Sequence, residues 1–264
     1  MKIGAVLSPV PDIGLVLEAA RVADECGLDA VGLWDHYHSQ QPEWGYVAGW
    51  ATLGAMVATT RYVKVVPMVI NSLHYELGTI AKESSMLALA SGGRFELGIG
   101  AGDWPASFEA WGRPFPGSTD RLARLEETVG SLRMIWSGEA VTFKGKHVDL
   151  SGAICTPAPA VAPRVVVGAG GSKRTMLEAI GYADEINVYE DLALIEIARR
   201  LAESSPSHPA VSVFMDWSMM QWPADPEVRI EHLSAAGVDR VFVGVGGPNM
   251  PERIASLAEI RARG

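Results

Sequence analysis

The sequence predicts an α/β fold in which eight parallel strands alternate with eight helices and close into a (β/α)8 TIM barrel. Short apolar runs of strand length recur along the chain, and a segment with helical periodicity follows each of them. The length of 264 residues suits a single domain spanning 1–264, because such barrels typically have about 250 residues. With 48% hydrophobic residues the chain can bury a large core. An open, doubly wound parallel sheet is the alternative.

The first half of the chain contains four of the expected strands, at 2–7, 29–34, 62–70 and 94–99. Helices are expected between them, at 13–26, 47–59 and 76–90. Asp12 can cap the first helix, because its side chain can accept hydrogen bonds from the N–H groups of the first turn. Pro67 lies inside the third strand, where proline cannot donate to a neighbour, so a bulge or irregular backbone is predicted there.

The second half contains the other four strands, at 164–167, 185–189, 211–216 and 240–245, each followed by a helix. Residues 104–118 are expected to be irregular, and Thr119 is expected to cap a long amphipathic helix. A small hairpin inserted at about 139–158 is expected to turn at Lys144-Gly145.

The charge balance is acidic, with 22 Lys and Arg residues against 31 Asp and Glu residues and a net charge of −9. This balance argues against nucleic acid or an anionic membrane as a general partner. Cys26 and Cys155 match no metal or redox spacing, so we expect reduced thiols in a cytoplasmic protein. The first apolar run is too short for a signal peptide, and no run reaches the length of a membrane span.

A TIM barrel carries its active site at the C-terminal ends of the strands, so the residues that follow each strand are the candidates. The fourth strand ends in a turn that contains Gly98, Gly100 and Gly102 and is followed by Asp103. Glycine has no Cβ, so a planar ligand or a phosphate can approach this backbone closely. A tight turn that needs glycine for its dihedral angles explains the pattern equally well. A dinucleotide-binding GxGxxG motif is excluded, because it needs glycine where Asp103 stands.

A second glycine turn, at 168–172, follows the fifth strand and opens a helix that begins with Lys173 and Arg174. Backbone N–H groups at the start of a helix bind anions, so this turn is a candidate phosphate site. Its spacing is not that of a P-loop. A strand-to-helix turn that simply needs glycine is the alternative.

The second strand is followed by Asp35-His36-Tyr37-His38. His36 can donate or accept a proton or hold a polar ring, or it can be a structural histidine bonded to nearby backbone. No third ligand cluster accompanies the two histidines, so we expect no metal. Asp103 is either a helix cap or solvated charge, or an acid close to the chemistry, whereas Asp216 is expected to be structural. With so few ionisable groups, the site suits a cofactor that performs the reaction itself.

Several motifs, in this order and spacing, resemble the bacterial luciferase-like superfamily and in particular its deazaflavin-dependent oxidoreductases. The similarity covers essentially the whole chain and includes 27–36 (GLDAVGLWDH), 90–103 (ASGGRFELGIGAGD), 108–115 (FEAWGRPF), 165–171 and 236–244.

The resemblance implies a cofactor with an isoalloxazine-type ring lying across the C-terminal ends of the strands. In the family the third strand ends in a bulge with a non-proline cis peptide behind the ring, which maps here to Pro67-Met68 or Met68-Val69. His36 matches the family's histidine at the reactive edge of the ring, and Asp103 falls where some members carry a catalytic carboxylate. The implied cofactor-binding residues are Asp35, Pro67, Met68, Val69, Gly100, Ala101 and Gly102 around the ring and ribityl chain, and Gly168, Ala169, Gly170 and Gly171 at the phosphate.

The resemblance therefore implies an oxidoreductase that transfers a hydride between coenzyme F420 and a small organic substrate. An FMN-dependent monooxygenase is the first alternative, and a flavin-binding barrel without catalytic activity is the second. Family members often form homodimers, for which helices 48–58 and 81–90, rich in small residues, could serve. The segment after the seventh strand, 218–225, is short for the family, so the identity of the substrate stays open.

Overall fold

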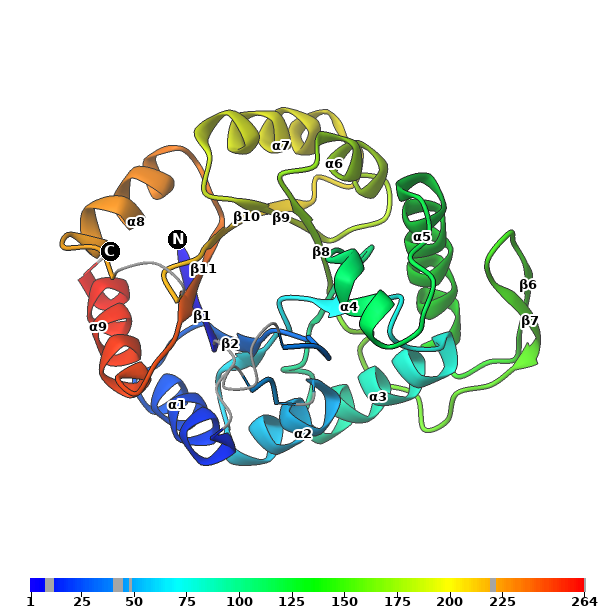
Figure 1. Ribbon diagram of the computed structural model, residues 1–264, viewed down its shortest axis with the longest axis horizontal. Helices are drawn as coiled ribbons and strands as arrows, with labels where there is room; N and C mark the ends of the chain where they lie inside the picture. The colour runs from blue at the N-terminus through cyan, green and yellow to red at the C-terminus, as the bar shows by residue number, and fades with distance from the viewer. Residues whose placement is uncertain (8–11, 40–44, 48, 219–221, 264) are drawn as a thin grey trace.

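The computed structural model describes residues 1–7, 12–39, 45–47, 49–218 and 222–263, and its strands form a ring surrounded by helices (Figure 1). Neighbouring strands of the ring pair in parallel. Their order around it is β3 (Lys64–Val65), β2 (Ala30–Leu33), β1 (Lys2–Leu7), β11 (Arg240–Val245), β10 (Ala210–Met215), β9 (Glu185–Tyr189), β8 (Val165–Gly170), β5 (Leu97–Gly100) and β4 (Ile70–Asn71).

The two short strands β3 and β4 are pieces of one barrel strand that pairs on both sides. The N–H of Val66 donates to the carbonyl of Val31 at 3.0 Å, towards β2. On the other side the N–H of Val65 donates to Arg94 at 3.2 Å, and the N–H of Glu96 donates back to Val65 at 3.0 Å. These bonds join the two ends of the sheet. The predicted TIM barrel is therefore confirmed, and the open sheet is excluded.

The helices pack on the outside of the barrel, where their apolar faces cover the outward-facing side chains of the strands (Figure 1). Asp12 caps the first helix as predicted, accepting hydrogen bonds from the N–H groups of Gly14 at 2.8 Å and Leu15 at 3.2 Å. The helices are α1 (Ile13–Glu25), α2 (Gly49–Thr59), α3 (Leu77–Ala90), α4 (Pro105–Ala110), α5 (Ser118–Ile135), α6 (Lys173–Ala179), α7 (Leu192–Ser204), α8 (Pro226–Ala235) and α9 (Met250–Arg263).

Three local predictions differ from the structure. The expected strand 62–70 is interrupted between β3 and β4, because the backbone bulges at the predicted proline, and the Met68–Val69 peptide is cis, at one of the two positions named. The expected irregular segment 104–118 contains α4. Thr119 does not cap α5, which starts one residue earlier, behind Gly117. Of the short segment 218–225, residues 219–221 lie outside the described residues.

The predicted hairpin is formed by β6 (Val141–Lys144) and β7 (Asp149–Ala153), which lie outside α5 in Figure 1. A single carboxylate of α5 holds its turn. Glu127 accepts hydrogen bonds from the backbone N–H groups of Lys146, His147 and Val148 at 2.7–2.9 Å. The hairpin therefore packs on a helix and adds no strand to the barrel.

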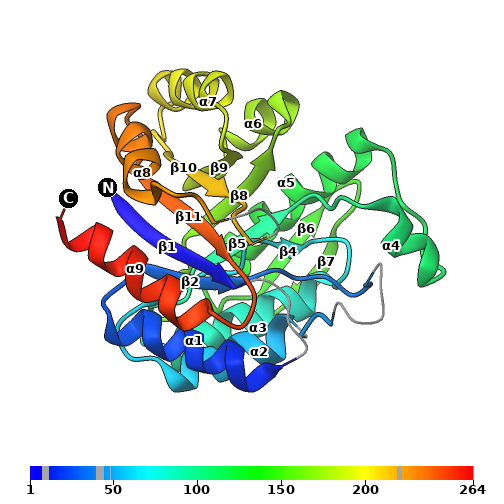
Figure 2. The same cartoon turned by 60° about the vertical axis from the view of Figure 1, so that its left-hand side comes forward.

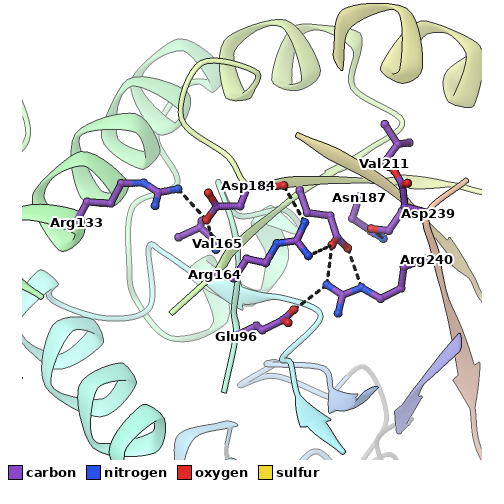
Figure 3. Close-up of polar contacts among 11 residues, drawn as sticks. Glu96, Arg133, Arg164, Val165, Asp184, Asn187, Val211, Asp239 and Arg240 are labelled. Carbon is purple, nitrogen blue, oxygen red and sulfur yellow. Dashed lines mark hydrogen bonds and ion pairs between the residues drawn. The ribbon is translucent and has the colours of Figure 1, made fainter. Parts of the chain in front are cut away.

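The parallel strands of the barrel all run in the same direction. Figure 2 shows this for β1 and β11, whose arrowheads mark the C-terminal end of the barrel, on the side of the molecule that carries α4. The opposite, N-terminal end is filled by an ionic network (Figure 3). Arg240, which is 3% exposed, donates to Glu185 at 2.7 and 3.0 Å and to Glu96 at 2.8 Å. Arg164 approaches the same Glu185 at 3.4 Å. The charges in this layer are paired within the protein, which closes this end of the barrel.

Candidate active site

A cavity of about 740 Å³ opens at the C-terminal ends of the barrel strands. It is lined by the residues that follow β2, by the bulge between β3 and β4, by the turns after β5 and β8, by the ends of β9 and β10, and by the starts of α5 and α6. Twelve of the thirteen predicted site residues line it: Asp35, His36, Met68, Val69, Gly100, Ala101, Gly102, Asp103, Gly168, Ala169, Gly170 and Gly171. Pro67, the other predicted residue, is not among the lining residues; it is buried behind the bulge.

The glycines of β5 and β8 make room first of all for the chain's own bulge. A Cβ on Gly98 would lie 1.8 Å from the carbonyl oxygen of Pro67, and one on Gly100 would lie 2.8 Å from the side chain of Val69. A Cβ on Gly168 would lie 3.0 Å from that same side chain. At Gly98 the close approach is therefore made by backbone, and not by a ligand. The bulge, seated in this way, presents Met68 and Val69 to the cavity.

Asp35 lines the cavity, but its carboxylate is held by the protein. It accepts hydrogen bonds from the Tyr75 hydroxyl at 2.8 Å and from the backbone N–H of Asn71 at 3.1 Å. Burial raises the pKa of this carboxyl to about 6, against the lowering effect of these two bonds. A Cβ on Gly49 would lie 2.5 Å from Asp35, so α2 packs directly on it. The arrangement makes Asp35 an anchor between β2, β4 and α2.

His36 lies among aromatic rings at the cavity wall. Its ring centroid is 5.9 Å from that of Trp34, 5.2 Å from Tyr46 and 5.7 Å from Trp104. Burial lowers the pKa of His36, and the nearby charge of Asp103 opposes that shift. The imidazole is therefore mainly neutral at neutral pH, with one ring nitrogen able to donate and the other able to accept a proton.

Asp103 is exposed at the cavity and is not a helix cap. The N-cap of α4 is Trp104, whose φ is +55°, and no side chain caps that helix. The charge of Asp103 acts on the pKa of His36 and on that of Tyr189, so its carboxylate lies within electrostatic reach of both side chains. The structure therefore excludes the helix cap and leaves Asp103 as an exposed charge near His36.

The predicted anion-binding turn lies where β8 leads into α6. Ser172 caps α6 by accepting a hydrogen bond from the N–H of Thr175 at 3.1 Å. Gly170 has a φ of +53°, and its Cβ would meet the ring of Tyr189 at 3.1 Å, so glycine is required there by the chain itself. A Cβ on Gly171 would have only one distant neighbour, at 3.9 Å. Gly171 therefore leaves open space at the cavity. Arg174 also lines the cavity, and its guanidinium donates to Glu178 at 2.7 Å and to Thr119 at 2.9 Å.

The tertiary structure adds lining residues that the sequence reasoning missed. Arg121, three residues into α5, lines the cavity, and its buried Nε has no hydrogen-bond partner among the described residues. Asn187 and Phe214 point inward from β9 and β10. Side chains alternate between the two faces of a strand, so this alternation could have predicted that they point into the barrel. Asp216, expected to be structural, lines the cavity and also accepts a hydrogen bond from Ser218 at 2.6 Å. Trp34 completes this set.

The described residues contain no group of three or more His, Cys, Asp or Glu side chains that could hold a metal ion. Within the same residues, none of the helices has both the length and the apolar character needed to cross a membrane. A closed parallel barrel with one glycine-lined cavity at the carboxyl ends of its strands is the architecture of a TIM-barrel protein that binds a small-molecule ligand. The sequence model of the luciferase-like monooxygenase family matches residues 2–204, and the chain belongs to that family, as the motifs indicated.

The chain is also similar in sequence to two kinds of enzyme. The chain is 32% identical to an F420-dependent glucose-6-phosphate dehydrogenase of Amycolatopsis mediterranei over 159 residues, which are 59% of this chain and 47% of that protein. It is 30% identical to a 5,10-methylenetetrahydromethanopterin reductase of Archaeoglobus fulgidus, covering 86% of this chain and 65% of that protein. The chain thus spans about half the length of the dehydrogenases that it matches.

Solved structures share the fold over the whole chain. An F420-dependent secondary alcohol dehydrogenase, solved with an F420-acetone adduct, superimposes with a TM-score of 0.83 at 20% identity and covers 98% of this chain and 97% of its own. The coenzyme F420 dependent tetrahydromethanopterin reductase of Methanopyrus kandleri gives a TM-score of 0.80 at 18% identity, covering 98% and 97%. The monooxygenase RslO1 of Streptomyces bottropensis gives 0.79 at 18% identity, covering 100% and 98%.

Proposed function

We propose that this chain is an oxidoreductase that transfers a hydride between coenzyme F420 and a small organic substrate. The observation that carries the proposal is the cavity, which brings the bulge, both glycine turns, His36 and Asp103 to one place. The names of the relatives support it, because several of those proteins are F420-dependent. The bound deazaflavin would supply the hydride chemistry, which the side chains themselves cannot perform.

The residues present suit a phosphorylated tricyclic cofactor. Arg121 offers a buried Nε without a partner among the described residues, and Gly171 offers backbone with open space around it in the cavity that Arg174 also lines. Guanidinium groups and the N–H groups of a glycine turn are both suited to a phosphate. The bulge at Met68–Val69, with Gly100, Ala101 and Gly102, would contact the ring.

His36 would hold or transfer a proton at the reacting edge of the ring, because a neutral imidazole can both donate and accept. The negative charge of Asp103 would favour the protonated form of His36. Asp35 would act through position, since its carboxylate is already bonded to Tyr75 and Asn71. We further propose a single domain over 1–264, a cytoplasmic location and a homodimer formed through helices of the 48–58 and 81–90 segments.

An FMN-dependent monooxygenase is the second candidate function, since the fold is shared with a solved monooxygenase and FMN also carries a phosphorylated tricyclic ring. The deciding experiment is a calorimetric or fluorescence titration of the purified protein with coenzyme F420 and, separately, with FMN. Preference for F420 is expected. Tight binding of FMN alone would turn the proposal to the monooxygenase, and binding of neither would leave the likeness as one of fold.

The phosphate turn is tested by Gly171→Val, which should weaken F420 binding at least about tenfold by filling the open space at the turn (a loss of about 1.4 kcal/mol). Gly170 is a poor choice, because its φ of +53° makes any substitution strained. The matched control is Gly181→Val, where a Cβ would meet nothing within 4 Å. Equal affinity of the two variants for F420 would remove the turn from the phosphate site.

A further inference from the structure

Arg121 lines the cavity from the first turn of α5, and the segment between α4 and α5 holds its guanidinium. The guanidinium carbon lies 4.2 Å from the centroid of the Phe115 ring, and Nη1 donates to the carbonyl of Pro116 at 2.7 Å. A guanidinium has several N–H donors, and the Nε of Arg121 is buried without a partner among the described residues. The protein therefore fixes this cation by an aromatic face and a hydrogen bond, and it leaves donors for a ligand.

Arg174, the other arginine that lines the cavity, is held differently. Its Nε donates to Glu178 at 2.7 Å, and its Nη1 donates to Thr119 at 2.9 Å. The charge of Arg174 is thus balanced by a carboxylate, whereas no ion pair of Arg121 is present in the described part of the chain. Arg121 is therefore the cation of this wall whose charge is left to a ligand.

Phe115 is itself held by a row of packed rings. The centroids of the Phe115 and Phe108 rings lie 5.1 Å apart, those of Phe108 and His74 lie 4.9 Å apart, and those of His74 and Tyr37 lie 4.2 Å apart. Phe108 is 2% exposed and the side chain of His74 is 4% exposed, so the middle of the row is buried. The row therefore fixes Phe115 against the body of the barrel.

Arg113 fastens the same segment to the loop between β4 and α3. Its guanidinium donates to the carbonyls of Leu73 at 2.6 Å and His74 at 3.3 Å, and it lies 5.8 Å from the centroid of the Phe108 ring. Backbone and rings are both tied to the barrel, so the aromatic face next to Arg121 has a fixed place relative to the cavity. Phe115 is not among the described residues that line the cavity.

We infer that Phe115 is a positioning residue for phosphate binding, whose ring holds the Arg121 guanidinium in the orientation that meets the phosphate of the cofactor. An arginine that is held in place before binding loses less rotamer freedom when the anion arrives. The inference rests on the proposed function, which assigns the cofactor's phosphate to this side of the cavity. Because Phe115 acts through Arg121, it contributes to affinity only when the ligand carries the phosphate.

The test compares two ligands by calorimetric or fluorescence titration: F420, and the same deazaflavin without its phosphate, which keeps the ring and the ribityl chain. Phe115→Leu should weaken F420 binding about fivefold and leave the affinity for the dephosphorylated ligand unchanged. Phe115→Tyr should restore F420 binding, because it keeps an aromatic face. The control is Trp111→Leu, an exposed aromatic residue between α4 and α5, which should change neither affinity.

A double-mutant cycle tests whether the effect passes through Arg121. Arg121→Met should weaken F420 binding more than Phe115→Leu does, because it removes the cation itself. In the Arg121→Met background, Phe115→Leu should cost little further affinity. Two losses that simply multiply would mean that Phe115 acts by another route, and the inference would be wrong.

The remaining outcomes separate the two proposals. Equal weakening of both ligands by Phe115→Leu would show that the ring only supports its segment, and unchanged F420 affinity would show that Arg121 does not need the ring. In either case the inference is wrong and the proposed function stands. If the wild-type protein binds FMN and not F420, the proposed function fails, and the same comparison between FMN and riboflavin decides the inference, because these two differ by the phosphate. If it binds neither cofactor, both proposals fail.

Discussion

The two ends of this barrel use charged side chains in opposite ways. At the N-terminal end, Arg240 and Arg164 meet Glu185 and Glu96 in a layer whose charges face one another (Figure 3). At the C-terminal end, His36 is half-buried among aromatic rings, Arg121 has a buried Nε without a described partner, and Asp103 is exposed at the cavity.

The difference shows how one barrel separates stability from function. Charges that are neutralised within the protein have nothing left to offer a ligand, and they become costly only when one partner is removed. Charges whose partners are incomplete keep their capacity to bind, and the rest of the fold must hold them in place. The four predictions below test this contrast, beginning with the largest expected effect.

Arg240→Met should destabilise the protein most, by about 4 kcal/mol, because it leaves Glu96 buried without its cation and Glu185 with only Arg164, 3.4 Å away. Urea denaturation measures the free energy of unfolding. The control is Arg133→Met, which removes an exposed partner of Asp184 and should cost less than about 1 kcal/mol. Equal effects of the two variants would contradict a structural role special to the buried layer.

Gly98→Ala should cost about 3 kcal/mol of unfolding free energy, since its Cβ would meet the Pro67 carbonyl at 1.8 Å and force the bulge to move. Gly130→Ala, in α5 with open space around its Cβ, should be neutral or stabilising by up to about 1 kcal/mol. Thermal or urea denaturation compares the two. If Gly98→Ala retained wild-type stability, the bulge would not be what requires glycine there.

His36→Ala should lower the turnover number about 10²-fold, equivalent to about 2.7 kcal/mol in the barrier, with F420 affinity changed only a few-fold. His38→Ala is the matched control, because His38 is the same residue type two positions on and is not among the lining residues. Steady-state kinetics and cofactor titration provide the two readouts. Wild-type turnover in His36→Ala would rule out a catalytic role for this histidine.

The smallest expected effect is on the pH dependence of the free energy of unfolding, and it comes from the buried carboxyl of Asp35. The nearest ion-pair candidate for Asp35 in the described part of the chain is His74, 4.0 Å away, and burial lowers the pKa of His74 to about 4 and keeps it neutral. The pKa of Asp35 is raised to about 6, above its unfolded value of 3.8, so folding favours the protonated acid. The stability from this group is present below pH 3.8 and is lost as the pH rises through about 6.

Asp35→Asn should therefore gain stability relative to wild type as the pH rises from 4 to 8, by up to about 2 kcal/mol. Urea denaturation across that range tests it, with the exposed Asp149→Asn as the control. Parallel stability curves for Asp35→Asn and wild type would show that the carboxyl titrates normally in the folded protein.

Local chemistry accounts for much of what could be predicted. Strand and helix periodicities, the Asp12 cap and the stop of α1 at Gly27, whose φ is +77°, depend on neighbouring residues and could be read directly from the sequence. The position of the bulge could also be anticipated. Proline cannot donate a hydrogen bond within a central strand, and the family resemblance placed a cis peptide at Pro67-Met68 or Met68-Val69. Twelve of the thirteen candidate residues line the cavity because they lie at or near the C-terminal ends of barrel strands, where a TIM barrel carries its site.

Tertiary packing decided the rest. Glu96 and Arg240 are 144 positions apart, and only closure of the barrel brings them to 2.8 Å. The need for glycine at Gly98 comes from the carbonyl of Pro67 on the adjacent barrel strand, which no local pattern reveals. Arg121 lines the cavity because of the way α5 packs against the barrel, and Phe214 lines it because its side chain lies on the inward face of β10. Sequence alone thus determined the elements and the end of the barrel that carries the site, whereas contacts between distant segments determined which charges are neutralised and which remain available to a ligand.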